Sequence, residues 1–177
     1  LLYFERTAAG DFKPPAAYPR QALVSVTTHD LATLAGFWLN RDIEARHAAG
    51  LLGSEEIYRA QLAARARDKQ KLLEALRREG LLPDWFPQDA SALAELTGEL
   101  HNAVVGFLAR TPSMLLLLNQ EDLTKETEQQ NLPGSTWQYP NWRRKMRFSI
   151  EELNSSPQAR DFALMFRNWL ERTGRAV

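Results

Sequence analysis

Short apolar runs that end on polar residues predict three β-strands in this chain. The runs are Leu1 to Glu5, Ala22 to Thr27 and Met114 to Leu118. Two of them are continuous in apolar character, with little alternation between apolar and polar positions. That pattern is typical of strands buried on both faces, as in a parallel sheet covered by helices.

Helical periodicity fills most of the remaining chain. Apolar residues recur at helical spacing from Leu31 onward, and Asp30 is a candidate N-cap for that helix. A long helix is expected to begin after Ser54 and to end at about Glu79, before Gly80. Further helical patterns span three ranges: Ala90 to Ala109, Ser149 to Leu153, and Ser156 to Arg172.

The order of these elements predicts an α/β fold built from consecutive β/α units. Three strands cannot close an eight-stranded barrel, so they would form only a part of one. The chain opens on Leu1-Leu2-Tyr3-Phe4-Glu5, without an initiator Met. We therefore expect a piece of a longer protein rather than a self-contained domain.

Composition excludes several classes of function. The 177 residues carry 22 basic and 22 acidic side chains, so a nucleic-acid surface or an anionic membrane is not expected as a partner. There is no cysteine, which excludes disulfides, thiolate metal sites and cysteine nucleophiles. Neither His47 nor His101 has a ligand partner at helical spacing, so no metal site is predicted and no cofactor is expected.

The pair His29-Asp30 is the leading candidate for chemistry, because it lies at the C-terminal end of a predicted parallel strand. Two interpretations fit the local pattern. Asp30 is either an ordinary helix cap beside a histidine, or a carboxylate that holds sugar hydroxyls and opposes positive charge developing on the ring.

Other polar clusters leave similar alternatives. Asp122 follows the third predicted strand and is either a helix cap or a functional acid. The run from Asn131 to Gly134 predicts a type II turn. Trp137, Tyr139 and Trp142 are unevenly spaced, so they are candidates for sugar stacking or for anchoring a loop.

Several of these motifs together resemble the 4-α-glucanotransferases, the amylomaltases or disproportionating enzymes of glycoside hydrolase family 77. The segment Val26-Thr27-Thr28-His29-Asp30-Leu31, followed by Gly36-Phe37-Trp38, is similar to the end of that family's seventh barrel strand. The run Asn131-Leu132-Pro133-Gly134, followed by Trp137 to Lys145, resembles its C-terminal block. Ala32 and Ser135 depart from the family pattern.

The resemblance implies a retaining transfer of α-1,4-glucan segments between maltodextrins, through a covalent intermediate. By that likeness Asp30 is the transition-state-stabilising carboxylate, and His29 and Asn131 bind the same sugar. The nucleophilic and acid/base carboxylates of the family lie in Arg-x-Asp-His and Glu-Asp-Leu-Gly patterns, and neither pattern occurs in this sequence. The 177 residues alone are therefore expected to be inactive.

The resemblance further implies the C-terminal part of one (β/α)8 barrel domain, about strands six to eight, in a helix-rich cytoplasmic enzyme. Residues 1–177 would form this part, with a helical insertion at about 50–110. Its partners would be the α-glucan substrate and the remainder of the catalytic domain. Two alternatives stay open: a non-catalytic α-glucan-binding module, and a helical interaction domain.

Overall fold

A two-stranded parallel sheet brings together the second and third predicted strands, which are far apart in the sequence. In the computed structural model, which describes residues 1–175, β1 (Leu23–Val24) pairs with β2 (Leu115–Leu116). Leu23 lies opposite Leu115 in the register. Both strands are shorter than predicted, but their positions and parallel direction agree with the prediction of β/α units.

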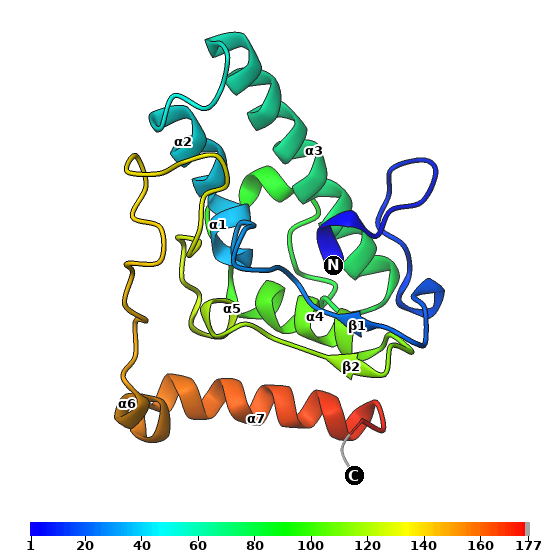
Figure 1. Ribbon diagram of the computed structural model, residues 1–177. Helices are drawn as coiled ribbons and strands as arrows, with labels where there is room; N and C mark the ends of the chain where they lie inside the picture. The colour runs from blue at the N-terminus through cyan, green and yellow to red at the C-terminus, as the bar shows by residue number, and fades with distance from the viewer. Residues whose placement is uncertain (176–177) are drawn as a thin grey trace.

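Helices account for nearly all of the regular secondary structure in the described chain (Figure 1). The α-helices are α1 (Leu34–Leu39), α2 (Arg41–Ala48), α3 (Glu55–Arg78), α4 (Gly98–Ala109), α5 (Gln120–Thr124), α6 (Ile150–Ser155) and α7 (Pro157–Arg172). Three short 3-10 helices add η1 (Leu2–Phe4), η2 (Pro15–Ala17) and η3 (Ala90–Ala92).

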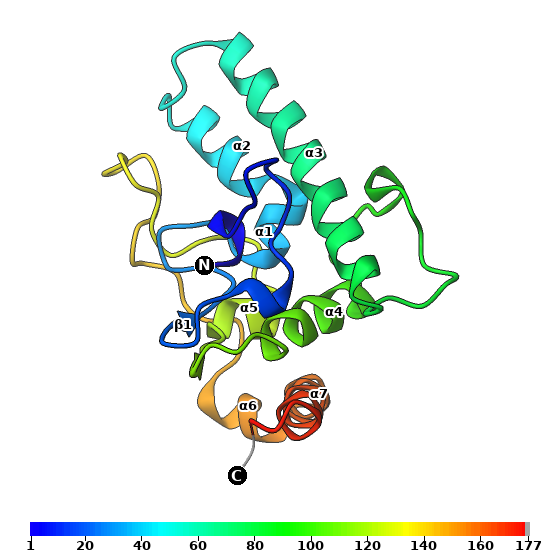
Figure 2. The same cartoon turned by 90° about the vertical axis from the view of Figure 1, so that its right-hand side faces the viewer.

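The long helix α3 follows the sequence signals that predicted it. The Ser54 side chain accepts a hydrogen bond from the Ile57 amide at 3.2 Å and so caps the helix. Gly80 follows the C-terminus with a φ of 63°, a backbone conformation that favours glycine. The N-terminal part of α3 extends away from the body of the molecule beside α2 (Figure 2).

The core is centred on α4, which is buried along nearly its whole length. Helix α7 crosses below it (Figure 1) and contributes the buried Trp169. The Trp169 indole nitrogen donates to Asn102 Oδ1 at 2.8 Å. A Cβ atom at Gly106 would lie 2.4 Å from the Trp169 ring, so only glycine lets the two helices approach this closely.

The N-terminal segment corrects one strand prediction. The segment predicted as a strand from Leu1 to Glu5 instead contains the 3-10 helix η1 (Leu2–Phe4). It makes one backbone hydrogen bond toward the sheet region, from the Leu2 amide to Ser25 O at 3.0 Å. The chain then turns, because the Leu1 and Leu2 carbonyls accept hydrogen bonds from the Phe4 and Glu5 amides. The Tyr3 ring stacks on that of Phe37, with ring centroids 4.7 Å apart.

Two predicted helix starts are also wrong. Helix α1 begins at Leu34, and its cap is Thr33, not Asp30. The helix expected from Ala90 begins at Gly98, with only η3 before it. In the loop between η3 and α4, the Leu93 carbonyl accepts a hydrogen bond from the Trp38 indole nitrogen. Local periodicity cannot predict such a long-range contact.

The sheet is exposed on one face. Leu23, Leu115 and Leu117 are each at least half exposed, whereas Val24 and Val26 are buried. The prediction that the strands are buried on both faces is therefore not met within residues 1–175. The reason is that no described element covers this face.

Candidate functional site

Asp30 lies where two segments distant in sequence meet. Its Oδ1 atom accepts a hydrogen bond from the Asn131 side-chain amide at 2.6 Å. The backbone supports this contact, because the Asn131 amide donates to the His29 carbonyl at 3.0 Å. The structure thus brings together the three residues singled out from the sequence, His29, Asp30 and Asn131.

The geometry leaves half of the Asp30 carboxylate available. His29 Nε2 lies 3.4 Å from Oδ1, the same oxygen that Asn131 contacts. The Asp30 side chain is 45% exposed and that of His29 54% exposed. Oδ2 makes no hydrogen bond with any residue in the described range 1–175, so it can accept bonds from a ligand's hydroxyl groups.

Gln129 holds the backbone of the site, and sequence reasoning did not identify it. Its side-chain nitrogen donates to Asp30 O at 3.2 Å and to Asn131 O at 2.6 Å. The Tyr139 hydroxyl in turn donates to the Gln129 carbonyl at 2.8 Å. Only the position of Gln129 next to the Asn131 turn could have marked it in the sequence.

The turn after Asn131 has the predicted geometry. The Ser135 amide donates to Leu132 O at 3.1 Å, and Gly134 has a φ of 85°, as the third position of a type II turn requires. Asn141 Oδ1 accepts a hydrogen bond from the Leu132 amide at 2.8 Å. The turn and the following aromatic loop are therefore held as one unit beside the site.

Trp142 is exposed next to His29. The two rings lie 4.9 Å apart at an angle of 49°, and 63% of Trp142 is exposed. Its φ of 59° is uncommon for a bulky residue, and backbone strain of this kind concentrates at functional sites. The strained conformation is held by the Trp142 amide, which donates to Gln130 O at 2.9 Å.

His29, Gln129 and Trp142 line a hollow of about 340 Å³ at the carboxyl ends of the strands, whereas Asp30 and Asn131 are not among its lining residues. Thr27, Thr28 and His29 line it after β1, Asn119 lines it after β2, and Trp142 closes one side. Its wall is mainly apolar, with leucine side chains and one exposed indole, and it also carries hydroxyl, amide, carboxylate and imidazole groups. That combination suits a polyhydroxylated ring with one apolar face.

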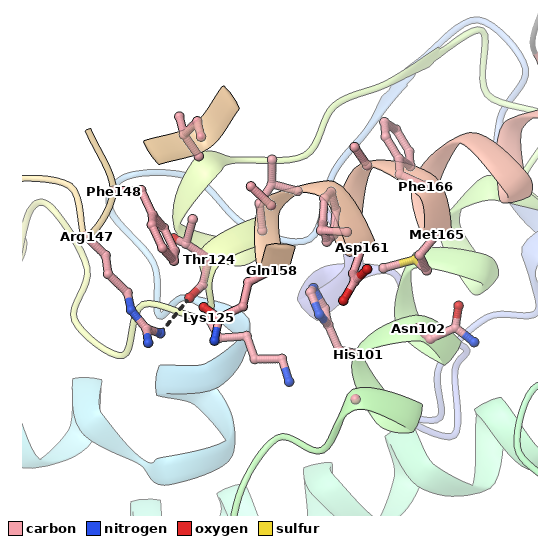
Figure 3. A pocket seen from close by; sticks show the side chains of 16 residues that line it. His101, Asn102, Thr124, Lys125, Arg147, Phe148, Gln158, Asp161, Met165 and Phe166 are labelled. Atoms are coloured by element: carbon pink, nitrogen blue, oxygen red, sulfur yellow. Dashed lines mark hydrogen bonds between the residues drawn. The ribbon is translucent and has the colours of Figure 1, made fainter. Parts of the chain in front are cut away.

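A larger hollow of about 660 Å³ lies elsewhere, between α4, α5 and α7 (Figure 3). Its wall is mainly apolar, and Phe162 stacks on His101 with ring centroids 5.4 Å apart. Burial lowers the pKa of His101 to about 4, with Lys125 adding to the effect, so this imidazole is neutral at pH 7. None of the three predicted site residues lines this hollow.

Asp122 accepts a hydrogen bond from the start of a helix, but not from the helix that follows the third predicted strand. It lies inside α5, whose N-cap is Asn119, and its Oδ1 accepts a hydrogen bond from the Leu34 amide at 2.7 Å. The carboxylate therefore caps α1, a helix that begins 88 residues earlier. The pKa of Asp122 is raised to about 7, mainly by burial. The hydrogen bond from Leu34 acts in the opposite direction, and the charge of Glu121 adds to the rise.

Neither a metal cluster nor a membrane span emerges from the described part of the chain. Residues 1–175 contain no group of three or more His, Asp or Glu side chains arranged to hold a metal ion. No helix among them combines the length and apolar character that a bilayer crossing requires.

Comparison with known proteins identifies the family. The family profile described as 4-alpha-glucanotransferase matches residues 1–151. The chain is 34% identical over 146 residues to a 4-alpha-glucanotransferase of Haemophilus influenzae. It is 35% identical over 147 residues to one of Mycobacterium tuberculosis.

A solved structure agrees with the sequence matches. The crystal structure of amylomaltase from Corynebacterium glutamicum superposes with a TM-score of 0.80 and 27% identity, covering 93% of this chain and 24% of that one. The match to the Haemophilus relative covers 82% of this chain but only 20% of that protein. The match to the Mycobacterium relative covers 81% of this chain and 19% of that protein. The chain belongs to the 4-alpha-glucanotransferase family, glycoside hydrolase family 77.

Proposed function

We propose that this chain supplies the sugar-holding part of the active site of a 4-α-glucanotransferase, which transfers α-1,4-glucan segments between maltodextrins. The observation that carries the proposal is the contact between Asp30 and Asn131 at 2.6 Å, beside His29 and at the mouth of a parallel strand pair. The family membership of residues 1–151 supports it.

Asp30 acts on the sugar ring beside the bond that is cleaved. Asn131 engages Oδ1 and leaves Oδ2 for ring hydroxyls, which strengthens the hold on a distorted ring and opposes positive charge at its anomeric carbon. His29 binds a hydroxyl of the same sugar. Trp142 offers its exposed indole face to the apolar side of a neighbouring glucose unit.

The bond-breaking groups come from other parts of the same enzyme. A retaining transfer needs a nucleophilic carboxylate and an acid/base carboxyl about 5–5.5 Å apart. Asp30 is assigned neither role, because the family patterns that contain those two residues are absent from this sequence. We therefore expect the 177 residues to be inactive without the remainder of the catalytic domain.

The exposed face of the sheet supports this arrangement. Leu23, Leu115 and Leu117 form an apolar row beside the hollow, and apolar side chains on a strand face pack against other elements in a complete fold. In this proposal the chain is the C-terminal part of a (β/α)8 barrel, with β1 and β2 among strands six to eight. The helices between them, at about 50–110, form an insertion.

Two other functions fit the structure less well. A helical interaction domain gives no reason for the parallel pairing of β1 with β2. A binding-only glucan module gives no reason for relatives that carry the name of a transferase.

The proposal is tested by incubating the full-length protein that contains this chain with maltotriose. Glucose together with products longer than maltotriose would support glucan transfer. Binding of maltodextrin without any redistribution of chain lengths would favour the module instead. No binding and no products would refute both.

A further inference from the structure

The start of α1 is attached to the segment that carries Asn131. The Leu34 amide donates to Asp122 Oδ1 at 2.7 Å, and the Thr33 hydroxyl donates to Glu126 O at 2.5 Å. Asp122 and Glu126 both precede Asn131 in the same stretch of chain. The helix that follows Asp30 is therefore fixed to the segment whose end contacts the Asp30 carboxylate.

Close packing reinforces this attachment. Gly36, in the first turn of α1, faces the backbone of Thr127, and a Cβ atom at Gly36 would lie 2.3 Å from Thr127 O. Because backbone cannot move aside as a flexible side chain can, any larger residue would push α1 and the Asn131 segment apart. The spacing between the two segments is thus defined by direct backbone contact.

The carboxyl group of Asp122 is costly where it lies. The residue is 2% exposed, and its Oδ2 atom has no hydrogen-bond partner among residues 1–175. A buried polar atom without a partner destabilises a fold. An apolar residue of similar size would avoid that cost but would leave the Leu34 amide without its acceptor.

We propose that Asp122 is a positioning residue that holds α1 against the Asn131 segment and thereby sets the contact between Asp30 and Asn131. The inference rests on the proposed function of Asp30. The loop from Asp30 to Thr33 is attached to this segment at both ends, by Asn131 at one and Asp122 at the other. Loss of the Asp122 attachment weakens the hold at one end, where the Thr33 bond to Glu126 then remains, and the carboxylate loses its orientation toward the sugar.

The test uses maltotriose kinetics of the full-length protein. Asp122→Ala is expected to lower kcat about tenfold or more while KM changes less than about threefold, because misplaced groups affect the transition state most. Asp122→Asn keeps an oxygen for the Leu34 amide and is expected to retain kcat within about threefold. The control is Leu76→Ala, which opens a cavity at a fully buried position of α3 outside the site.

The measurements separate positioning from general destabilisation. If Asp122→Ala reduces kcat no more than Leu76→Ala does, or if Asp122→Asn is as impaired as Asp122→Ala, the positioning role is refuted. If Asp122→Ala does not fold, Gly36→Ala separates the same two segments and is expected to lower kcat similarly; wild-type kcat in Gly36→Ala would then overturn the inference.

A structural measurement distinguishes failure of this inference from failure of the proposed function. Amide hydrogen exchange of the peptide containing Asn131 is expected to be faster in Asp122→Ala than in wild type and unchanged in Leu76→Ala. Unchanged exchange would contradict the attachment, whatever the activity. Full activity of Asp30→Asn would instead refute the function assigned to Asp30 and leave the attachment to be judged by exchange alone.

Discussion

Two buried titratable groups give this fold opposing responses to pH. Burial lowers the pKa of His101 to about 4 and raises that of Asp122 to about 7. The two are neighbours, because the backbone of Asp122 contributes to the pKa of His101 and raises it. Other charges also act on them: Lys125 lowers the pKa of His101 and Glu121 raises that of Asp122. Burial and the charge of Asp122 raise the pKa of Tyr3, which stays neutral over this pH range.

The signs follow from proton binding in the folded and unfolded states. Between pH 4 and 6.5, His101 is neutral in the folded state, because its pKa there is about 4, and takes up a proton on unfolding, where its pKa is the ordinary 6.5. Its contribution to the free energy of unfolding therefore falls as pH drops through that range. Between pH 3.8 and about 7, Asp122 is protonated in the folded state and releases its proton on unfolding. Its contribution to the free energy of unfolding therefore rises as pH drops through that range. From about pH 4 to 6.5 the two slopes cancel.

Substituting one of the two groups exposes the pH dependence of stability that the other one causes. At 1.36 kcal/mol per pKa unit, either shift corresponds to about 3–4 kcal/mol across its full range. Between pH 6.5 and 4.5, Asp122→Asn should therefore lose about 2–3 kcal/mol of unfolding free energy relative to wild type, and His101→Phe should gain a similar amount.

The assay is urea unfolding of the protein and both variants from pH 4.5 to 7.5, followed by tryptophan fluorescence. The relevant quantity is each variant's difference from wild type at every pH, because that difference cancels the contributions of other groups. Parallel curves for wild type and both variants would refute the reasoning, since they would mean that neither group changes its proton occupancy on unfolding.

Two further substitutions test the sugar platform and the helix packing. Trp142→Ala should raise the KM for maltotriose about threefold to tenfold, as the loss of an aromatic contact of about 0.5–1.5 kcal/mol implies. The control variant Trp137→Ala removes an indole outside the hollow and should leave KM unchanged. Equal effects of the two substitutions on KM would contradict a stacking role for Trp142. Gly106→Ala should destabilise the protein by about 1–3 kcal/mol, because the new methyl group meets the Trp169 ring between α4 and α7. An unchanged urea midpoint would contradict that packing.

Local signals predicted part of the fold well. Ser54 and Gly80 mark the ends of α3 in the sequence because both act on their own helix. The type II turn at Pro133-Gly134 follows for the same reason, since its residues determine its backbone angles. The strand positions were predicted, but not that Leu1 to Glu5 contains a 3-10 helix, because its backbone bonds depend on what lies beside it.

The site itself depends on contacts that local patterns do not encode. Asp30 and Asn131 are 101 residues apart, and Asp122 caps a helix to which it is not adjacent in sequence. The family resemblance placed His29, Asp30 and Asn131 together, whereas charge and periodicity alone left Asp30 equally readable as a helix cap. The structure assigns that cap to Thr33 and so leaves the Asp30 carboxylate available.

Asp30→Asn in the full-length protein tests the central claim most directly. The substitution keeps the size of the side chain and removes the charge that is proposed to oppose positive charge on the sugar ring. The exposed residue Asp84 provides the matched control, Asp84→Asn. The account predicts that release of glucose from maltotriose falls by about a hundredfold or more in Asp30→Asn, with a smaller change in KM, and is unchanged in Asp84→Asn. Wild-type turnover by Asp30→Asn would contradict it.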